Sequence, residues 1–557
     1  MFYRTSVRAL AGALAVSAML TACVENPLDV KNPNNPDVDK VYKSPANAET
    51  QSSQLFKNMF NGQYNSSDDI WTQSMSMSFE SHSQLGNFGM GTRAAIPRNP
   101  IDNSIGNNVN TGNFRDFDFM SRGARTATNT IAALNGFAAA NVSLGSLARD
   151  ARAKSFAYFS LGYALGNLSL FYDSAAIVSA DQEATFVPPF SGYKAVNVAA
   201  LAAIDSAIDI ANSPAAKGTG AGGWPIPADW MSTPGTIDRE SWIKLLRSYK
   251  ARFRAGVART PAERTAVDWN LVIADATNGI TENFVINCNA TTGWCNAAGG
   301  PLRQLRTSSG WSQMTPFLLG MADSTGAYDA WLATPLTQRS AFLLRTADKR
   351  FPAGDSRAAQ QLVTGTGKGG PATTSILYFR NRPSGEDTPA EPWGTWYYDN
   401  WRFWAIGAAS GNGPFIPFTL AENNMLAAEG YLRANNVAAA AALLDKTRVP
   451  AGLAKLAGEV TSLTQPVPGG NACVPRVPQA PNFTSTACGT IFEAMKWEKR
   501  VETSFTGYAQ WFVDSRGWGD LVQGTALHWP VPYQELYARL LPSYTTQEKA
   551  VKGTYGF

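Results

Sequence analysis

Residues 151–173 read ARAKSFAYFSLGYALGNLSLFYD and carry the clearest structural signal in the chain. Large apolar side chains in this stretch recur near one helical face, at Phe156, Phe159, Tyr163 and Leu170. Residues 121–140, just upstream, are the expected partner helix. This part of the sequence therefore predicts a helical hairpin.

Further helices are predicted along the rest of the chain. Apolar residues recur every three or four positions at Val198, Leu201, Ile204 and Ile208, and again at Trp242, Leu245, Leu246, Tyr249, Phe253 and Val257. Capping boxes that start helices are Thr260-Pro261-Ala262-Glu263 and Thr419-Leu420-Ala421-Glu422. The helix after the second box is expected to end near Arg433 and to pair with residues 437–447, and residues 491–503 begin the last pair. The hairpins are like degenerate tetratricopeptide units, so the expected fold class is mainly α.

Two long segments, residues 279–316 and 354–417, interrupt these helices. They are rich in Gly and Pro and crowded with Trp and Tyr. Segments of this length are usually functional or partly strand-forming. We therefore expect long, aromatic-rich irregular loops with minor β-structure, inserted into a single domain of residues 46–557.

The N-terminal residues have the pattern of a lipoprotein signal peptide. Arg4 and Arg8 precede an uncharged run, and Leu20-Thr21-Ala22-Cys23 follows in the order of a lipobox. The run of roughly ten apolar residues is too short to span a bilayer, which takes about 20. We expect cleavage of residues 1–22 and acylation of Cys23, with residues 23–45 as a tether rich in Pro, Asn and Asp. An ordinary secretory peptide with an accidental cysteine is the alternative.

Composition limits the remaining function classes. The 557 residues are 44% hydrophobic and 16% charged, which excludes a disordered chain and allows a large core. Lys and Arg number 47 against 43 acids, so the charge predicts no nucleic-acid partner. No stretch after Met19 is expected to span a membrane, and the mature body is expected to be soluble.

Four cysteines remain beyond Cys23, in two close pairs. Cys288 lies near Cys295, and Cys473 lies near Cys488. In an oxidising compartment an even count in close pairs favours two local disulfides. A metal site is the competing interpretation, but neither spacing is CxxC and the chain has only two histidines.

Several motifs, in their shared order, resemble those of the SusD/RagB family of outer-membrane nutrient-binding lipoproteins. The family's hallmark helices are matched by Arg152-Ala153-Lys154-Ser155-Phe156-Ala157-Tyr158-Phe159 through Leu170-Phe171-Tyr172, and by Trp242-Ile243-Lys244 with Lys250-Ala251-Arg252-Phe253. Later matches are Leu420-Ala421-Glu422, Ala427-Ala428-Glu429-Gly430, Asp445-Lys446-Thr447-Arg448, Glu498-Lys499-Arg500-Val501-Glu502 and Trp511-Phe512-Val513-Asp514-Ser515-Arg516-Gly517-Trp518. Phe253 replaces the usual Tyr, and Val513 and Ser515 interrupt an Asp-Leu-Arg pattern. The chain is identified as a divergent member of the family.

This resemblance implies a SusD-like helical fold and a lipid anchor in the outer membrane, with the body facing the cell surface. It implies capture of an oligosaccharide or another polymeric nutrient, a RagB-like peptide included, and delivery to a SusC-like TonB-dependent transporter. A family likeness carries over fold and task, and does not locate the ligand. The hallmark charges are expected to pair across stacked helices; they are Arg152, Glu422, Glu429, Arg500 and Asp514.

The ligand surface is predicted from aromatic residues, because ring faces bury C–H surfaces while nearby polar groups satisfy hydroxyls. The densest candidates follow Glu391; they are Trp393, Trp396, Tyr397, Tyr398, Trp401 and Trp404, with Asp399 and Asn400 among them. Trp71 and Trp294 are further candidates, the latter inside the predicted Cys288–Cys295 loop, and Trp311 lies just beyond it. The alternative is that these rings form a satellite core beneath a long loop.

A helical glycoside hydrolase is the main rival function, since paired carboxylates can act as acid and nucleophile. Its candidate acids are Asp68, Asp69, Glu391 and Asp399. The sequence lacks a GxSxG elbow and an HExxH helix, and residues 365–370 are interpreted as a flexible turn, not a phosphate loop. An inert tetratricopeptide scaffold is a third possibility. We expect no catalytic residue, cofactor or metal.

Overall fold

The computed structural model describes residues 41–557 except 66–67, 84, 108–110, 184–185, 218–223, 296–312, 365–375, 387–390, 392 and 410. The predicted lipobox, Cys23 and most of the tether lie outside the described residues, as do Trp311 and residues 365–370.

Helices dominate the described chain, which confirms the mainly α fold class. The α-helices are α3 (Pro45–Tyr64), α4 (Ile70–Met77), α5 (Met90–Ala94), α6 (Thr111–Ala139), α7 (Leu147–Phe171), α8 (Tyr193–Asn212), α9 (Arg239–Gly256), α10 (Pro261–Thr265), α11 (Trp269–Thr277), α13 (Pro316–Leu319), α14 (Ala327–Ala333), α15 (Arg357–Thr364), α16 (Trp404–Ala408), α17 (Leu420–Arg433), α18 (Val437–Arg448), α19 (Ile491–Thr503), α20 (Gln510–Trp518) and α21 (Tyr533–Ala538). Short 3-10 turns are η1 (Asn87–Gly89), η2 (Ala228–Trp230), η3 (Gly320–Ala322), η4 (Leu336–Gln338), η5 (Ser384–Glu386) and η6 (Gly470–Ala472).

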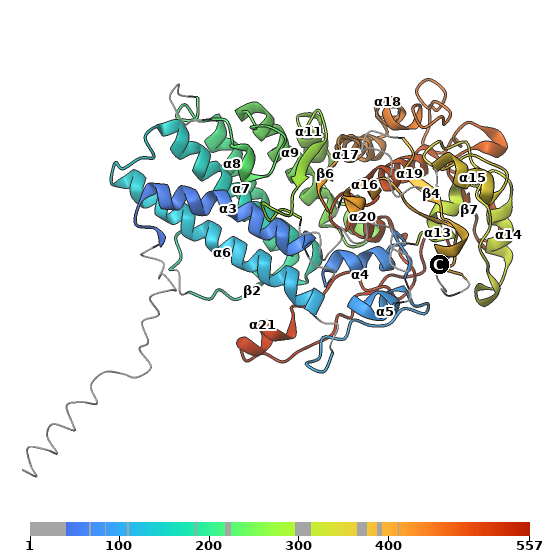
Figure 1. The fold of residues 1–557 in the computed structure, drawn as a ribbon, viewed down its shortest axis with the longest axis horizontal. Coiled ribbons are helices and arrows are strands. Elements are labelled where there is room, and N and C mark those ends of the chain that lie inside the picture. Colours follow the sequence, from blue (N-terminus) through green and yellow to red (C-terminus); the bar gives the residue numbers. More distant parts are fainter. Residues whose placement is uncertain are drawn as a thin grey trace, which may run out of the picture.

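The longest helices, among them α3, α6, α7, α8 and α9, pack together at one end of the molecule (Figure 1). The central member is α7, which is buried on almost every side. Two glycines allow its neighbours to approach closely. A Cβ atom at Gly162 would lie 2.5 Å from Cγ1 of Ile204 in α8, and one at Gly166 would lie 2.5 Å from Cε2 of Phe253 in α9. The small residues of 151–173 therefore matter to the packing as much as its large ones.

The predicted helix starts are largely confirmed. Oγ1 of Thr419 accepts a hydrogen bond from the N–H of Glu422 at 2.9 Å, and α17 then runs to Arg433. Thr260 caps α10 in the same way, but that helix ends after five residues. In α8, Ile204 is fully buried whereas Val198 is 66% exposed, so the buried face of this helix passes through Val196 and Ala200 and not through the predicted Val198.

The expectation that no later segment could span a membrane needs one correction. Among the described residues, α8 is long and apolar enough to do so by length and composition alone. Its contacts are with α7 and α9 inside the folded body. We therefore describe α8 as a packed helix of the bundle.

The described strands form four two-stranded antiparallel sheets. The pairs are β1 (Ser174–Ala176) with β2 (Phe190–Gly192), β3 (Phe284–Cys288) with β6 (Gly413–Phe418), β4 (Phe379–Asn381) with β5 (Tyr398–Asn400), and β7 (Arg476–Pro478) with β8 (Thr486–Cys488). Two of the four sheets are built from the long aromatic-rich segments. The minor β content expected there is confirmed.

Two disulfides join Cys288 to Cys295 and Cys473 to Cys488, as predicted from the local spacing. The first begins at the last residue of β3, and the second ends at the last residue of β8. Each bond therefore fixes a loop next to one of the small sheets.

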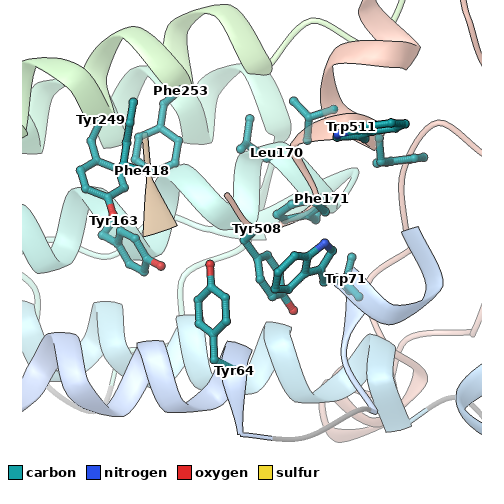
Figure 2. Packing of buried hydrophobic residues seen from close by; sticks show 14 of the residues in the cluster. Tyr64, Trp71, Tyr163, Leu170, Phe171, Tyr249, Phe253, Phe418, Tyr508 and Trp511 are labelled. Atoms are coloured by element: carbon teal, nitrogen blue, oxygen red, sulfur yellow. The ribbon is translucent and has the colours of Figure 1, made fainter. Parts of the chain in front are cut away.

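A large aromatic core connects the helical end to the rest of the molecule. Figure 2 shows part of it, where Trp71 and Tyr64 meet Tyr508 from the C-terminal third of the chain. Phe557 packs edge-on against Phe79 and Phe317, which themselves stack with their ring centroids 4.3 Å apart. The core thus combines residues that are remote in sequence.

Candidate functional site

The predicted aromatic platform lies around the β4–β5 hairpin, and most of its rings are inside the protein. Trp396 and Tyr398 are fully buried, Trp401 is 1% exposed and Trp393 is 4% exposed. The polar atoms of these rings have internal partners: Nε1 of Trp396 donates to the carbonyl of Phe342, and the hydroxyl of Tyr398 donates to Gln360. These four rings hold the loop to the body of the protein.

Asp399, the acid predicted to accompany the rings, is also buried. Arg380 donates to both of its carboxylate oxygens, at 2.9 and 3.0 Å. Burial raises the pKa of Asp399 to about 6, although the Arg380 guanidinium opposes that rise. The same guanidinium lies 4.6 Å from the ring centroids of both Trp401 and Trp404, which stack on each other. Asp399 therefore anchors an internal cation that supports the tryptophan stack.

Tyr397 is the one member of the predicted ligand set that is partly exposed. The Arg357 guanidinium covers its ring at 4.0 Å and donates through Nη2 to the carbonyl of Arg382. Tyr397, with Arg357 against its ring, is therefore the part of the predicted platform that reaches the surface.

Trp71 and Trp294 are buried as well. Nε1 of Trp71 donates to a Glu80 carboxylate oxygen at 3.1 Å, and its ring lies beside Tyr508 (Figure 2). The Cys288–Cys295 disulfide does restrain Trp294, but the ring points inward and packs against Phe60 at 5.7 Å. A closed loop can direct an aromatic ring into the core as readily as into solvent.

These positions favour the alternative interpretation of the aromatic cluster. In this conformation nine of the candidate ligand residues are buried: Trp71, Trp294, Trp393, Trp396, Tyr398, Asp399, Asn400, Trp401 and Trp404. The physical reason is that the rings bury a large apolar area against one another, which outweighs their display on a loop. A direct ligand contact remains a prediction for Tyr397.

The hallmark charges pair across helices, as expected. Arg152 donates to Glu49 at 2.7 Å, joining α7 to α3, and Arg252 donates to both oxygens of Glu422, joining α9 to α17. Other pairs between helices are Arg264 with Glu429 and Lys499 with Asp514, whereas Arg500 of α19 pairs with Asp520 just beyond the end of α20. These residues support the packing of the helices.

Two of the acids considered for hydrolysis also have structural partners. Asp69 caps α4 by accepting the N–H of Thr72 at 2.6 Å, and burial, with the nearby Asp116 carboxylate, raises its pKa well above the usual value. Asp399 is held by Arg380 as described. Among the residues that the structure describes, no group of three His, Cys, Asp or Glu side chains is placed to hold a metal ion.

An open hollow of about 680 Å³ lies between α10, α11, α17 and α19. Its lining is mixed: the apolar side chains of Val267, Leu432, Leu463 and Phe492 face the polar side chains of Thr265, Asp268, Asn270 and Arg433, with Trp269 and Ala434 completing the wall. The volume falls within the range of small-molecule sites, about 300–1,000 Å³. Rigid helices form most of the wall.

Arg433 organises this hollow. Its guanidinium lies 4.9 Å from the ring centroid of Trp269 and 5.4 Å from that of Phe492. It also donates from Nε and Nη2 to Glu429, at 3.1 and 2.9 Å. An aromatic face, a positioned cation and exposed amide and hydroxyl groups are the chemistry that a sugar or an acidic sugar requires.

The hollow was not predicted from the sequence. Its residues come from four separate segments, of which three are ordinary helix ends and the fourth, Leu463, lies in the connection between α18 and α19. The only local signal was the second capping box, which predicted the helix that ends at Arg433.

Comparisons with known proteins agree with this mainly α architecture of paired helices and long aromatic-rich loops. No protein-family model and no curated protein matches the chain. Solved structures do match it. A SusD homolog from Parabacteroides distasonis is 15% identical with a TM-score of 0.52, covering 84% of each chain.

Two further structures are less similar. A SusD superfamily protein from Bacteroides thetaiotaomicron is 11% identical, with a TM-score of 0.48 over 85% of this chain and 89% of its own. A laminarin binding SusD-like protein is 12% identical, with a TM-score of 0.46 over 90% of this chain and 99% of its own. The match to the Parabacteroides protein shows that the chain has a SusD-like fold, which confirms the resemblance at the level of fold.

Proposed function

We propose that the chain is a divergent SusD/RagB protein that captures a polymeric nutrient, foremost an oligosaccharide, at the cell surface and passes it to a TonB-dependent barrel. The observation that carries this proposal is the SusD-like fold over 84% of the chain. The lipobox ending at Cys23 supports attachment to the outer membrane. Binding in such a role has only to be selective and reversible.

The hollow beside Arg433 is the proposed ligand-binding surface. Phe492 is half-buried and can stack against the apolar face of a sugar ring, while Asn270 is exposed and can bind a hydroxyl. Arg433 is fixed by Glu429 and is therefore pre-organised. Tyr397 defines a second, smaller candidate surface on the long loop.

The proposed activity is binding without cleavage. Both acids are buried, Asp69 as the cap of α4 and Asp399 in a pair with Arg380, so neither carboxyl group lies open to a substrate as acid and nucleophile work requires. Transfer of an intact oligomer to a transporter would need no hydrolysis at this step.

Affinity electrophoresis through gels that contain soluble polysaccharides tests the binding role. A retarded protein band without new reducing ends supports a binder, and new reducing ends would make it a hydrolase. Phe492→Ala should weaken retardation about five- to a hundredfold, by analogy with the loss of one stacking ring. Leu271→Ala is the matched control, because Leu271 is exposed on α11 and lies outside the hollow.

If Tyr397→Ala weakens retardation by polysaccharide while Phe492→Ala does not, the ligand-binding surface would be assigned to the long loop that carries Tyr397. If no polysaccharide retards the protein and it binds members of a peptide library, the ligand class would be peptide, as in RagB, and not glycan.

The anchor and the transporter are tested separately. Mass spectrometry of the mature N-terminus should find an acylated Cys23, and an unmodified first residue would contradict the lipoprotein assignment. Detergent extracts should contain a barrel protein that co-purifies with the tagged chain. A protein recovered alone from every mild detergent would contradict the handover to a transporter.

A further inference from the structure

The short helix α21 carries an unusual cluster of exposed apolar side chains. Tyr537 is 74% exposed, Leu540 is 92% exposed and Leu541 is 45% exposed. In Figure 1, α21 stands at the lower edge of the molecule, clear of the main helical layers. An apolar tip of this kind is costly in water and requires an explanation.

The backbone at Leu540 is strained, which makes its exposure more significant. Leu540 has φ +58° and follows the C-cap residue Arg539 of α21. The N–H of Leu541 donates to the carbonyl of Leu536, and that of Leu540 donates to the carbonyl of Tyr537. This is the hydrogen-bond pattern of a Schellman motif, in which glycine is strongly preferred at the position that Leu540 occupies. The fold therefore holds a leucine in water at a position where glycine would relieve strain.

A second exposed segment continues the tip. Arg539 donates to the carbonyl of Pro188 at 2.7 Å and covers the ring of Phe190 at 4.2 Å. The residues before Pro188 are also exposed, Val187 at 64% and Phe186 at 48%. The tip thus consists of Phe186, Val187, Tyr537, Leu540 and Leu541, and we call it the apolar tip.

The apolar tip lies near the point where the predicted tether joins the folded body. The hydroxyl of Tyr42 meets Oγ1 of Thr130 on α6 at 3.0 Å. The Arg125 guanidinium, one turn earlier on α6, donates to the carbonyl of Phe186 at 2.6 Å. Eighteen residues, 24–41, separate Cys23 from Tyr42, which allows a reach of up to about 60 Å.

We propose that the apolar tip is a membrane-docking surface, through which the folded body rests on the lipid bilayer that holds its anchor. This inference relies on acylation of Cys23 but is independent of the nutrient site. The tip consists of the five named side chains on one short helix and one loop segment, fewer than the roughly 20–30 residues that a stable protein interface takes from each partner. A bilayer requires only that a few apolar side chains pass the headgroups, with the Tyr537 hydroxyl at the polar boundary.

The charge next to Leu540 is compensated. Arg539 forms an ion pair with Glu535 at 2.6 Å and donates a hydrogen bond to the carbonyl of Pro188. The acyl anchor keeps the protein next to the membrane, so the effective lipid concentration at the apolar tip is high. Even a weak affinity of the tip for lipid would then keep most molecules in the docked orientation. The tip would then fix the orientation of the body, with α21 toward the lipid.

Sedimentation with vesicles of phosphatidylethanolamine and phosphatidylglycerol tests this proposal on the mature chain carrying Cys23→Ser. We expect measurable binding at millimolar lipid, and about tenfold weaker binding for Leu540→Asp and Leu540→Gly. Leu362→Asp on α15 is the matched control, because Leu362 is 82% exposed but lies on another element. Leu540→Gly should also melt at or above the wild-type temperature, since it removes the strain.

The acylated protein provides a second measurement. A Leu540→Cys variant labelled with an environment-sensitive dye should be quenched by brominated lipids, and a labelled Leu362→Cys variant should not be quenched. The four remaining cysteines are in disulfides and leave this thiol as the labelling site. The proposal is overturned if the wild type does not sediment with lipid, if Leu362→Asp weakens binding equally, or if Leu540 instead supports a dimer.

Discussion

Arg264 and Glu429 form a fully buried ion pair that joins α10 to α17, with Nε and Oε1 2.9 Å apart. Burial alone would raise the pKa of Glu429, but attraction to Arg264 brings it to about 2. A second carboxylate, Asp514 of α20, accepts from the same guanidinium at 3.1 Å. One arginine therefore connects three helices at the base of the Arg433 hollow.

Removing one partner of this pair should be far more damaging than removing an exposed pair. Glu429→Ala should lower the free energy of unfolding by about 3–5 kcal/mol, because Arg264 is left charged and buried. Asp118→Ala, which breaks the exposed pair with Arg122, should cost less than about 1 kcal/mol. Urea unfolding measures both variants, and equal losses would contradict the view that Glu429 supports packing.

Stability should fall as the pH rises from 6.5 to 8. Burial raises the pKa of Glu80 from 4.5 to about 8, so in this range the folded state keeps a proton that the unfolded state has lost. One such group lowers the free energy of unfolding by about 1.4 kcal/mol per pH unit. The buried histidines oppose this fall at the lower end of the window, because burial lowers the pKa of both His82 and His528 from 6.5 to about 3 and the unfolded state still binds part of these protons at pH 6.5.

Urea unfolding at pH 6.5, 7.25 and 8 measures the slope. Glu80→Gln should reduce the slope, since the variant cannot ionise at this position, and the buried Asp69 and Asp116, whose pKa values are also raised, should account for the remainder. An unchanged slope in Glu80→Gln would show that other groups control the pH dependence.

The two disulfides should both stabilise the protein. Replacing Cys473 and Cys488 by serine should cost about 3 kcal/mol, because the bond closes a 15-residue separation. Cys288 and Cys295 are 7 residues apart, so their replacement should cost somewhat less. Thermal unfolding of each double variant measures the effect, and peptide mapping without reductant should recover only these two pairings.

Substitutions of buried tryptophans should lower stability, whereas a substitution in the Arg433 hollow should weaken ligand binding. Trp71→Ala and Trp396→Ala should each lower the free energy of unfolding by about 3–5 kcal/mol, because both rings are fully buried. Phe492→Ala should leave the melting temperature nearly unchanged and weaken retardation by polysaccharide. Melting curves and affinity gels on the same preparations decide this, and selective loss of binding in Trp396→Ala would restore the loop platform as the site.

Much of the fold could be predicted because its signals are local. The capping box at Thr419 sets the start of α17 through one hydrogen bond to Glu422, and the periodicity of 491–503 coincides with α19. The disulfide pairing could be predicted in the same way, because each cysteine is bonded to the one nearest to it in the sequence. α10 was harder to predict, because nothing within its five residues shows how soon the helix ends.

The functional surface could not be predicted for the opposite reason. Whether Trp396 or Trp71 faces solvent depends on rings contributed by distant segments, such as Phe342 and Tyr508. The Arg433 hollow exists only after α11, α17 and α19 have packed together. The aromatic residues picked out from the sequence are therefore mostly buried rings, and Tyr397 is the one described ring among them that is partly exposed.

The cluster of Phe79, Phe317 and Phe557 has a consequence for biogenesis. This part of the core cannot close until a residue at position 557 has been synthesised and brought back to position 79. Early segments can form helices, but a chain that has not yet been synthesised as far as position 557 lacks the ring that packs against Phe79 and Phe317. Late closure of this kind keeps the growing chain unfolded for longer, which would suit the export that we propose from the lipobox.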